Sequence, residues 1–349
     1  MPSLRKSRLD DNNVTYMYTN IRLPKDLKPI LYNVWLKPDL NSTFDFDGTV
    51  DILFKCVKPT KRIILHSEKL NITNYYLYEH LTERGRPKSS LSVKMFKNEI
   101  NSHIIFETDG FLQTTGMEYI LTVKFKGMLA TDNLGFYKQS YKTKSGQTRY
   151  FAVGLFGLWN ARKAFPCFDE PEFKAKFQLT IKHDKGLQVV SNMPIKGRKA
   201  VDHLVESRTK PTPQMSTYLL QFLVSDFLFF EGNTKSGTKV CCRPYSPHRL
   251  PRLGIRVWAD ENSLNYTNRA FDVTKRTLSF YEEYTGIPYP LPKLDLAFIP
   301  NYYAAAFEGW GFIGFNSEDV LHNKAMDTPA EYFLQTDYVA HAVARMVIK

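Results

Sequence analysis

The sequence is poor in cysteine and lacks the short motifs of several large enzyme classes. Its 349 residues include four cysteines and no C-x-x-C pair, which excludes the common cysteine-based zinc modules. No G-x-S-x-G elbow, Walker loop or dinucleotide-binding fingerprint occurs in it. These absences exclude elbow-type serine hydrolases, P-loop nucleotide hydrolases and Rossmann-type oxidoreductases.

Long hydrophobic runs are also missing. The best candidate, Tyr218–Phe230, is interrupted by Gln221, Ser225 and Asp226 and is too short to span a bilayer. The first eight residues are basic, but no apolar core follows them. The sequence as it stands therefore predicts neither a membrane span nor a signal peptide.

Acidic residues are in the minority, and the net charge is +12. This charge favours attraction to an anionic glycan or a membrane surface. The alternative, which we prefer, is that it comes from solvated lysine-rich loops such as 138–144 and 196–199. No nucleic-acid-binding motif accompanies the charge, so we predict no nucleic-acid partner.

The hydrophobic pattern divides the chain into three parts. Residues 1–18 are polar and predict a flexible tail. Residues 19–231 alternate with period two between turn sequences, which predicts an antiparallel β domain of sandwich-like or saddle-like form. In residues 232–349 strands alternate with helical patterns at 270–284 and 329–348. The predicted fold class is α+β.

The stretch Val339–Arg345 contains half of a metal-binding pattern. In H-E-x-x-H, two histidines one helical turn apart hold zinc, and the glutamate is the general base. Here His341 is present, but Ala342 stands at the glutamate position and Arg345 at the second histidine position. Alanine accepts no proton, and arginine stays protonated and offers a metal no lone pair. We therefore predict no catalytic residue, no metal cofactor and a structural role for His341.

Longer motifs give this stretch a context. The segments AFPCFDEP (164–171), TGIPYPLPKLD (285–295) and AAFEGWG (305–311) occur in this order. The set closely resembles the aminopeptidase N family of zinc metallopeptidases (gluzincin aminopeptidases) over residues 20–349. The resemblance implies that 232–349 is the first part of a thermolysin-like domain, ending just after the degenerate zinc-binding helix. The third zinc ligand and the transition-state tyrosine of the family then find no position here.

The resemblance also implies a remnant of an amine-binding site. Glu308 matches the acidic residue of the family motif G-A-M-E-N, which receives the free α-amino group of a peptide. The expected remnant consists of Ala305, Ala306, Phe307, Glu308 and Gly309.

A second family motif has changed as well. The family segment T-Q-F-E-P falls on 154–158, where Leu155 and Gly157 replace its glutamine and glutamate. A surviving amine pocket and a leftover carboxylate both stay open as interpretations of Glu308. Our sharper hypothesis is that Arg345 takes the former zinc position and balances this carboxylate, since an unpaired buried charge is costly.

These losses predict a non-catalytic member of the family that binds a protein or a peptide. Two alternatives stay open. The chain could be the N-terminal part of a zinc-dependent aminopeptidase that removes N-terminal residues from peptides, or an extracellular adhesive module that uses only the β domain. The apolar residues around the 329–348 helix further predict that the chain dimerises, binds a partner or belongs to something longer.

Four N-x-S/T sequons predict glycosylation. They lie at Asn13, Asn41, Asn71 and Asn265. Because N-glycans are added in the secretory pathway, the sequons favour an extracellular or cell-surface location.

Overall fold

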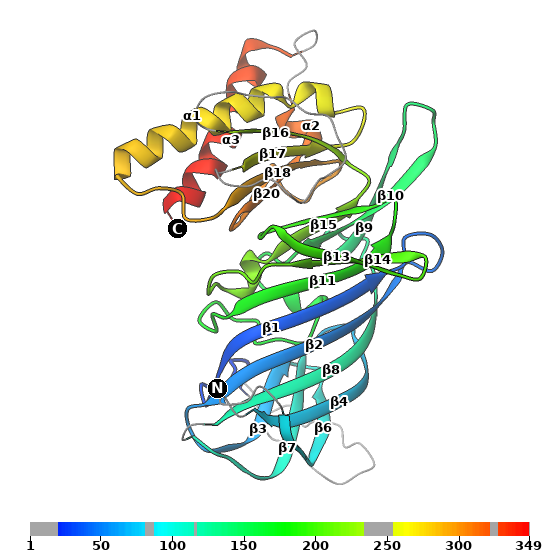
Figure 1. Ribbon diagram of the computed structural model, residues 1–349, viewed down its shortest axis with the longest axis vertical. Coiled ribbons are helices and arrows are strands. Elements are labelled where there is room, and N and C mark those ends of the chain that lie inside the picture. The colour runs from blue at the N-terminus through cyan, green and yellow to red at the C-terminus, as the bar shows by residue number, and fades with distance from the viewer. Residues whose placement is uncertain (1–19, 81–86, 115–116, 234–253, 322–326, 349) are drawn as a thin grey trace, which may run out of the picture.

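A computed structural model describes residues 20–80, 87–114, 117–233, 254–321 and 327–348. The tail predicted for 1–18 and the sequon at Asn13 lie outside these ranges. Within them the chain forms an N-terminal region of β-sheets and a C-terminal region in which helices cover a further sheet (Figure 1).

The largest sheet has eight strands in the order β13-β14-β11-β1-β2-β8-β4-β5. Its pairs are antiparallel except that β1 and β11 run parallel. The strands are β1 (Leu27–Pro38), β2 (Asp45–Cys56), β4 (Asn71–His80), β5 (Pro87–Leu91), β8 (Glu118–Met128), β11 (Lys176–Asp184), β13 (Ile195–Val201) and β14 (Leu204–Thr209).

Two smaller antiparallel sheets complete the N-terminal region. One contains β3 (Thr60–His66), β7 (His103–Leu112) and β6 (Val93–Asn98); the other contains β12 (Gln188–Ser191), β15 (Gln221–Ser225), β10 (Thr148–Leu155) and β9 (Gly135–Lys142). The apolar side chains of β1 and β2 are buried at every second position, as the period of a strand requires. They join the other two sheets in one hydrophobic core, which confirms the predicted β domain.

The C-terminal region is built on a mixed sheet in the order β16-β17-β18-β20-β19. Its strands are β16 (Leu228–Asn233), β17 (Gly254–Ala259), β18 (Lys293–Ile299), β19 (Ala306–Gly309) and β20 (Phe312–Asn316). The strand pairs β17–β18 and β18–β20 are parallel. The end of the predicted β domain is divided: β15 stays in that domain, whereas β16 pairs with β17. The change of sheet therefore falls at Leu228, inside the range 19–231 assigned to the β domain.

Local sequence explains both predicted helices. Helix α1 (Asn268–Thr285) buries one face and ends at Gly286, whose positive φ of 65° suits a C-terminal cap. Helix α3 (Pro329–Ile348) begins with a capping box, because the Glu331 carboxylate accepts the Thr328 N–H and the Thr328 hydroxyl accepts the Glu331 N–H. A short helix, α2 (Ser317–Val320), and three 3₁₀ turns complete the elements; the turns are Ala161–Lys163, Thr217–Leu219 and Leu264–Tyr266.

Two hydrophobic cores organise the C-terminal region. One is enclosed between the sheet and the helices, where α3 packs on α1 and on β19. The other joins the regions, because Leu155 and Leu223 of the four-stranded sheet meet Ala297 and Phe312 of the mixed sheet. The two regions are therefore packed continuously against each other.

Candidate functional site

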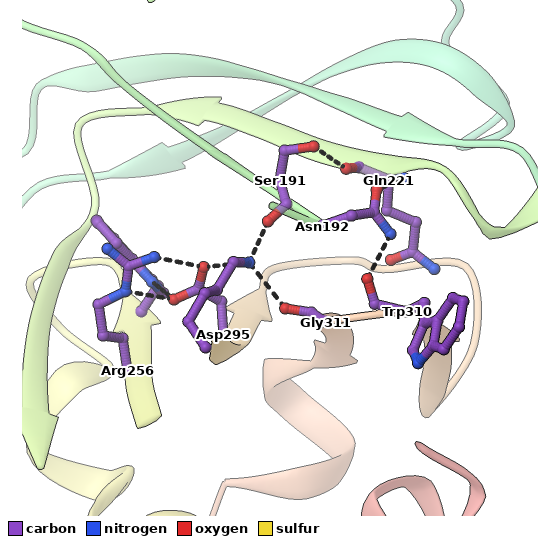
Figure 2. A network of polar contacts seen from close by, with 9 residues as sticks. Ser191, Asn192, Gln221, Arg256, Asp295, Trp310 and Gly311 are labelled. Carbon is purple, nitrogen blue, oxygen red and sulfur yellow. Dashed lines mark hydrogen bonds and ion pairs between the residues drawn. The ribbon is translucent and has the colours of Figure 1, made fainter. Parts of the chain in front are cut away.

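A buried charge network joins the two regions (Figure 2). Arg256 donates to both carboxylate oxygens of Asp295, at 2.6 and 2.7 Å, and the Trp258 indole N–H adds a third bond at 3.1 Å. The Lys293 ammonium lies 2.6 Å from the same carboxylate and also donates to the carbonyls of Ser191 and Gly311. Because Ser191 belongs to the β domain and Gly311 to the second region, Lys293 connects them directly.

Burial sets the proton affinities in this network. Desolvation lowers the pKa of Lys293 to about 8, although the neighbouring Asp295 opposes the shift. The pKa of Asp295 is lowered because the two cations outweigh the effect of its own burial. The network is therefore a charged unit in which the carboxylate is held ionised by its partners.

Asn192 extends the junction. Its side-chain amide donates to the carbonyls of Leu219 and Trp310, and its oxygen accepts the Gln221 N–H at 2.8 Å. The Gln221 side chain donates in turn to the Phe307 carbonyl at 3.3 Å. These bonds attach the β19–β20 hairpin, which carries Glu308, to the β domain.

Two glycines allow the β19–β20 hairpin to lie close to the β domain. A Cβ at Gly309 would lie 2.7 Å from the Leu219 carbonyl oxygen, and one at Gly311 would lie 2.4 Å from that of Asn192. Gly311 also has a positive φ of 84°, which glycine adopts at little cost. Gly309 replaces the asparagine of the G-A-M-E-N motif, so this change has a packing consequence.

The ion pair expected from charge balance is present between the hairpin and α3. Arg345 Nη1 lies 3.2 and 3.4 Å from the two carboxylate oxygens of Glu308. The Glu308 side chain is 8% exposed, whereas that of Arg345 is 56% exposed. The negative charge also contributes, after burial, to raising the pKa of the Tyr302 hydroxyl. The carboxylate is thus enclosed by protein, and the guanidinium covers it from the solvent side.

The rest of the predicted site is divided between core and surface. Ala342 is fully buried in the core of the second region. His341 is exposed and lines an open groove of about 470 Å³ between α1 and α3, together with Asp337, Arg276 and Phe280. Asp337, His341 and Arg345 are four residues apart and lie along the exposed face of α3.

Phe307 fills the place of a lost side chain. A Cβ at Gly157 would lie 2.8 Å from the Phe307 ring. The aromatic residue in the hairpin thus occupies the space next to a position where the family motif has a glutamate. The same turn exposes Leu158 and Trp159, which are 70% and 59% accessible, and Leu158 has a positive φ of 60°. Apolar side chains are therefore exposed close to Phe307 of the hairpin.

The residues present do not fit a zinc ion. A catalytic zinc site takes about three histidine or carboxylate ligands from the protein. Here the guanidinium of Arg345 stands where the pattern needs an imidazole, and it brings a positive charge onto Glu308. Within the described ranges, no three His, Cys, Asp or Glu side chains gather in a way that could hold a metal. No chemical step through zinc follows from these residues.

Sequence reasoning missed the Lys293–Asp295–Arg256 network. Lys293 and Asp295 belong to a motif quoted for the family resemblance, but no role was assigned to them. Every residue of the strand KLDLAFI is buried. A lysine and an aspartate in an otherwise apolar strand could have indicated a buried ion pair.

The sequons in the described ranges are accessible. Asn41, Asn71 and Asn265 are exposed. The Asn41 side chain donates to Asp184 at 2.8 Å, an exposed bond that a glycan would replace. No helix in the described part of the chain is both long and apolar enough to cross a bilayer.

Comparisons with known proteins identify the two regions. Residues 28–219 match the peptidase M1 N-terminal domain, and residues 269–346 match the peptidase family M1 domain. The chain is 34% identical to endoplasmic reticulum aminopeptidase 1 of Rattus norvegicus over 334 residues, which is 95% of this chain and 34% of the relative.

Two other relatives show the same coverage. Endoplasmic reticulum aminopeptidase 2 of Homo sapiens is 33% identical, over 95% of this chain and 33% of the relative. Aminopeptidase N of Canis lupus familiaris is 32% identical, over 94% and 33%. The chain thus spans about a third of the length of these relatives.

Proposed function

This chain belongs to peptidase family M1, and we propose that it is a member that binds a protein or a peptide without cleaving it. The observation that carries the proposal is the ion pair between Arg345 and Glu308 at 3.2 Å. A cation that belongs to the chain itself pairs with the buried Glu308 carboxylate, at a position where the zinc pattern needs a neutral imidazole.

The missing base supports the same conclusion. Ala342 offers a methyl group, buried in the core, where the pattern places the general base. A positioned general base typically contributes about 10²- to 10⁴-fold to a rate. Val343 and Met346, the next buried residues of α3, are apolar and accept no proton either.

Binding is supported by what surrounds Glu308. The β19–β20 hairpin keeps a buried carboxylate at Glu308 and is attached to the β domain through Asn192, and the turn next to Phe307 exposes the apolar side chains of Leu158 and Trp159. These features provide charge and apolar contact without a reactive group. We propose a protein or peptide partner on this basis; an anionic glycan or membrane surface is a weaker candidate that rests on the net charge of +12.

Metal analysis combined with an activity assay tests the proposal. The purified chain should hold no zinc after dialysis against micromolar zinc and should not release the chromophore from an aminoacyl p-nitroanilide. An M1 aminopeptidase with an intact H-E-x-x-H motif, treated in parallel, is the positive control. Stoichiometric zinc together with chelator-sensitive turnover would overturn the proposal.

The second candidate is the N-terminal part of an active aminopeptidase. It is favoured by the names of the relatives and by the third of their length that the chain covers. Mass spectrometry of the native protein separates the candidates. A longer polypeptide that contains this sequence and removes N-terminal residues would favour the second candidate.

We further propose that the protein passes through a compartment where N-glycans are added. The exposed Asn41, Asn71 and Asn265 support this, as do the names of two relatives, which place them in the endoplasmic reticulum. Glycosidase treatment of the native protein should increase its electrophoretic mobility. An unchanged mobility, with all three asparagines unmodified in peptide mapping, would contradict the proposal.

A further inference from the structure

Two histidines outside the candidate site are buried side by side at one end of the three-stranded sheet. His66 ends β3 and His103 begins β7, and the two residues are paired across the strands. They are 2% and 1% exposed, and their ring centroids lie 4.9 Å apart. Two neutral imidazoles pack well at this distance, whereas two imidazolium ions would repel each other in a site that water hardly reaches.

The pair lies where three parts of the β domain meet. His66 exchanges two backbone hydrogen bonds with Cys167, at 2.8 and 3.1 Å, so the sheet is joined here to the segment 164–171. The same segment carries Glu170, whose carboxylate accepts the Leu23 N–H at 2.8 Å and thereby holds the chain that leads into β1. A change at His66 therefore acts on the sheet, on this segment and on the chain that leads into β1.

The surroundings keep both imidazoles neutral. Burial lowers the pKa of His66 to about 2, and the charges of Arg162, His103 and Arg22 add to the shift. The pKa of His103 is lowered by its burial and by Arg162, although a hydrogen bond with the backbone of Ile21 opposes the shift. In the described part of the chain Nδ1 of His66 has no hydrogen-bond partner, so a doubly protonated ring would carry a buried N–H without an acceptor.

The acidic groups nearby pair with the arginines. Asp169 accepts from Arg162 at 2.9 Å, and Glu170 lies 3.3 Å from Arg22. Burial raises the pKa of Asp169 despite its arginine partner, so on acidification this carboxyl group opposes the effect of the histidines. Burial also raises the pKa of the Cys167 thiol, which stays uncharged. A test of the histidines must therefore compare variants that differ in the histidines alone.

We propose that His66 and His103 form a pH-sensitive contact that holds the three-stranded sheet, the segment 164–171 and the chain leading into β1 together at neutral pH and loosens them when the imidazoles take up protons. An exposed histidine takes up a proton near pH 6.5, and the buried neutral one does not, so the open state binds more protons below that pH. The equilibrium constant for opening then rises by up to about tenfold per histidine for each pH unit below this value. Above it the contact keeps its full stability.

Hydrogen exchange followed by mass spectrometry at about pH 7 and about pH 5 tests the proposal. Exchange of the β3 and β7 amides, corrected for the intrinsic effect of pH, gives the opening constant. We expect this constant to be at least about tenfold larger at the lower pH. The amides of β10 and β15, which belong to the other small sheet, are the internal reference and should change less than about twofold.

The variants are His66→Gln, His103→Gln and the two combined, which keep polar side chains but remove the titrating rings. His203→Gln is the matched control, because His203 is an exposed histidine between β13 and β14. Each single variant should lose part of the increase in the opening constant, the double variant should lose all of it, and His203→Gln should keep it.

NMR titration of the unchanged protein gives a readout that does not depend on the folding of any variant. The ring signals of His66 and His103 should not titrate between about pH 7.5 and pH 5 while the protein stays folded.

Three results would overturn the inference. They are an opening constant of β3 and β7 that does not change with pH, an increase that persists in the folded double variant, and titration of either ring near pH 6.5 in the folded protein. None of them bears on the proposed lack of catalysis, which is tested separately by bound zinc and turnover.

Discussion

Two carboxylates of the C-terminal region are paired in different ways. Asp295 is fully buried, and its three side-chain partners, Arg256, Lys293 and Trp258, are buried or nearly so. Glu308 is almost as deeply buried, but its arginine partner is 56% exposed. One pair is enclosed within the junction of the two regions, and the other has an arginine that solvent reaches.

This difference in exposure distinguishes Asp295, to which we assign a structural role, from Glu308, to which we propose a functional one. An ion pair enclosed on all sides cannot exchange its partner without local unfolding, and losing one member leaves an uncompensated charge. A pair that water reaches from one side is screened and contributes less to stability. We therefore expect Asp295 to contribute most to the stability of the junction between the two regions. We expect Glu308 to affect mainly what binds beside the β19–β20 hairpin.

The largest expected effect follows from neutralising Asp295. Asp295→Asn removes the carboxylate that pairs with two buried cations and should reduce the free energy of unfolding by about 3–5 kcal/mol. Urea unfolding followed by tryptophan fluorescence measures the loss. Glu308→Gln is the matched control and should cost less than about 1 kcal/mol. Equal losses in the two variants would remove the distinction between these carboxylates.

Lys293→Met should have the next largest effect. The variant keeps the length of the side chain but leaves the carbonyls of Ser191 and Gly311 without their ammonium donor. The expected loss in unfolding free energy is about 1–3 kcal/mol, accompanied by faster hydrogen exchange in the β19–β20 hairpin. Lys174→Met, at an exposed position, should change neither quantity.

The pH dependence of stability tests the same lysine. Burial lowers its pKa in the folded state to about 8, whereas the unfolded value is 10.5. Between these values the unfolded chain holds a proton that the folded chain has released, so this group makes the unfolding free energy rise with pH. The slope is up to about 1.4 kcal/mol per pH unit. The difference in unfolding free energy between the protein and Lys293→Met should change accordingly from pH 7 to pH 9.5, and parallel curves would contradict this.

The smallest effect on stability should come from the ion pair between Arg345 and Glu308. Arg345→Ala removes one partner of a buried carboxylate and should cost about 1 kcal/mol, whereas Glu308→Gln leaves an already exposed guanidinium and should cost about 0.5 kcal/mol or less. A double-mutant cycle in urea gives the coupling energy. A coupling above about 3 kcal/mol would place Arg345 with the structural charges instead of the exchangeable ones.

The elements of the C-terminal region could be predicted in some detail. The helix expected at 329–348 is observed with the same bounds, and the one expected at 270–284 extends by two residues at its start and one at its end. The signals for these helices are local ones: the apolar spacing marks the buried faces, Gly286 the end of α1, and the Thr328–Glu331 capping box the start of α3. The assignment of β16 was less successful, because strand patterning cannot tell which of two sheets a strand will join.

The sequence alone determined which chemistry is missing at positions 342 and 345, because a side chain's ability to accept a proton or bind a metal depends on its own atoms. It also indicated the family, the β domain in the N-terminal region and the combination of strands and helices in the C-terminal region. The tertiary structure decided which distant groups meet: Lys293 bridges the regions, the Phe307 ring takes the space beside Gly157, and Arg345 covers Glu308 from the solvent side. Such contacts depend on the register and packing of several elements together, and the local pattern of any single element does not contain that information.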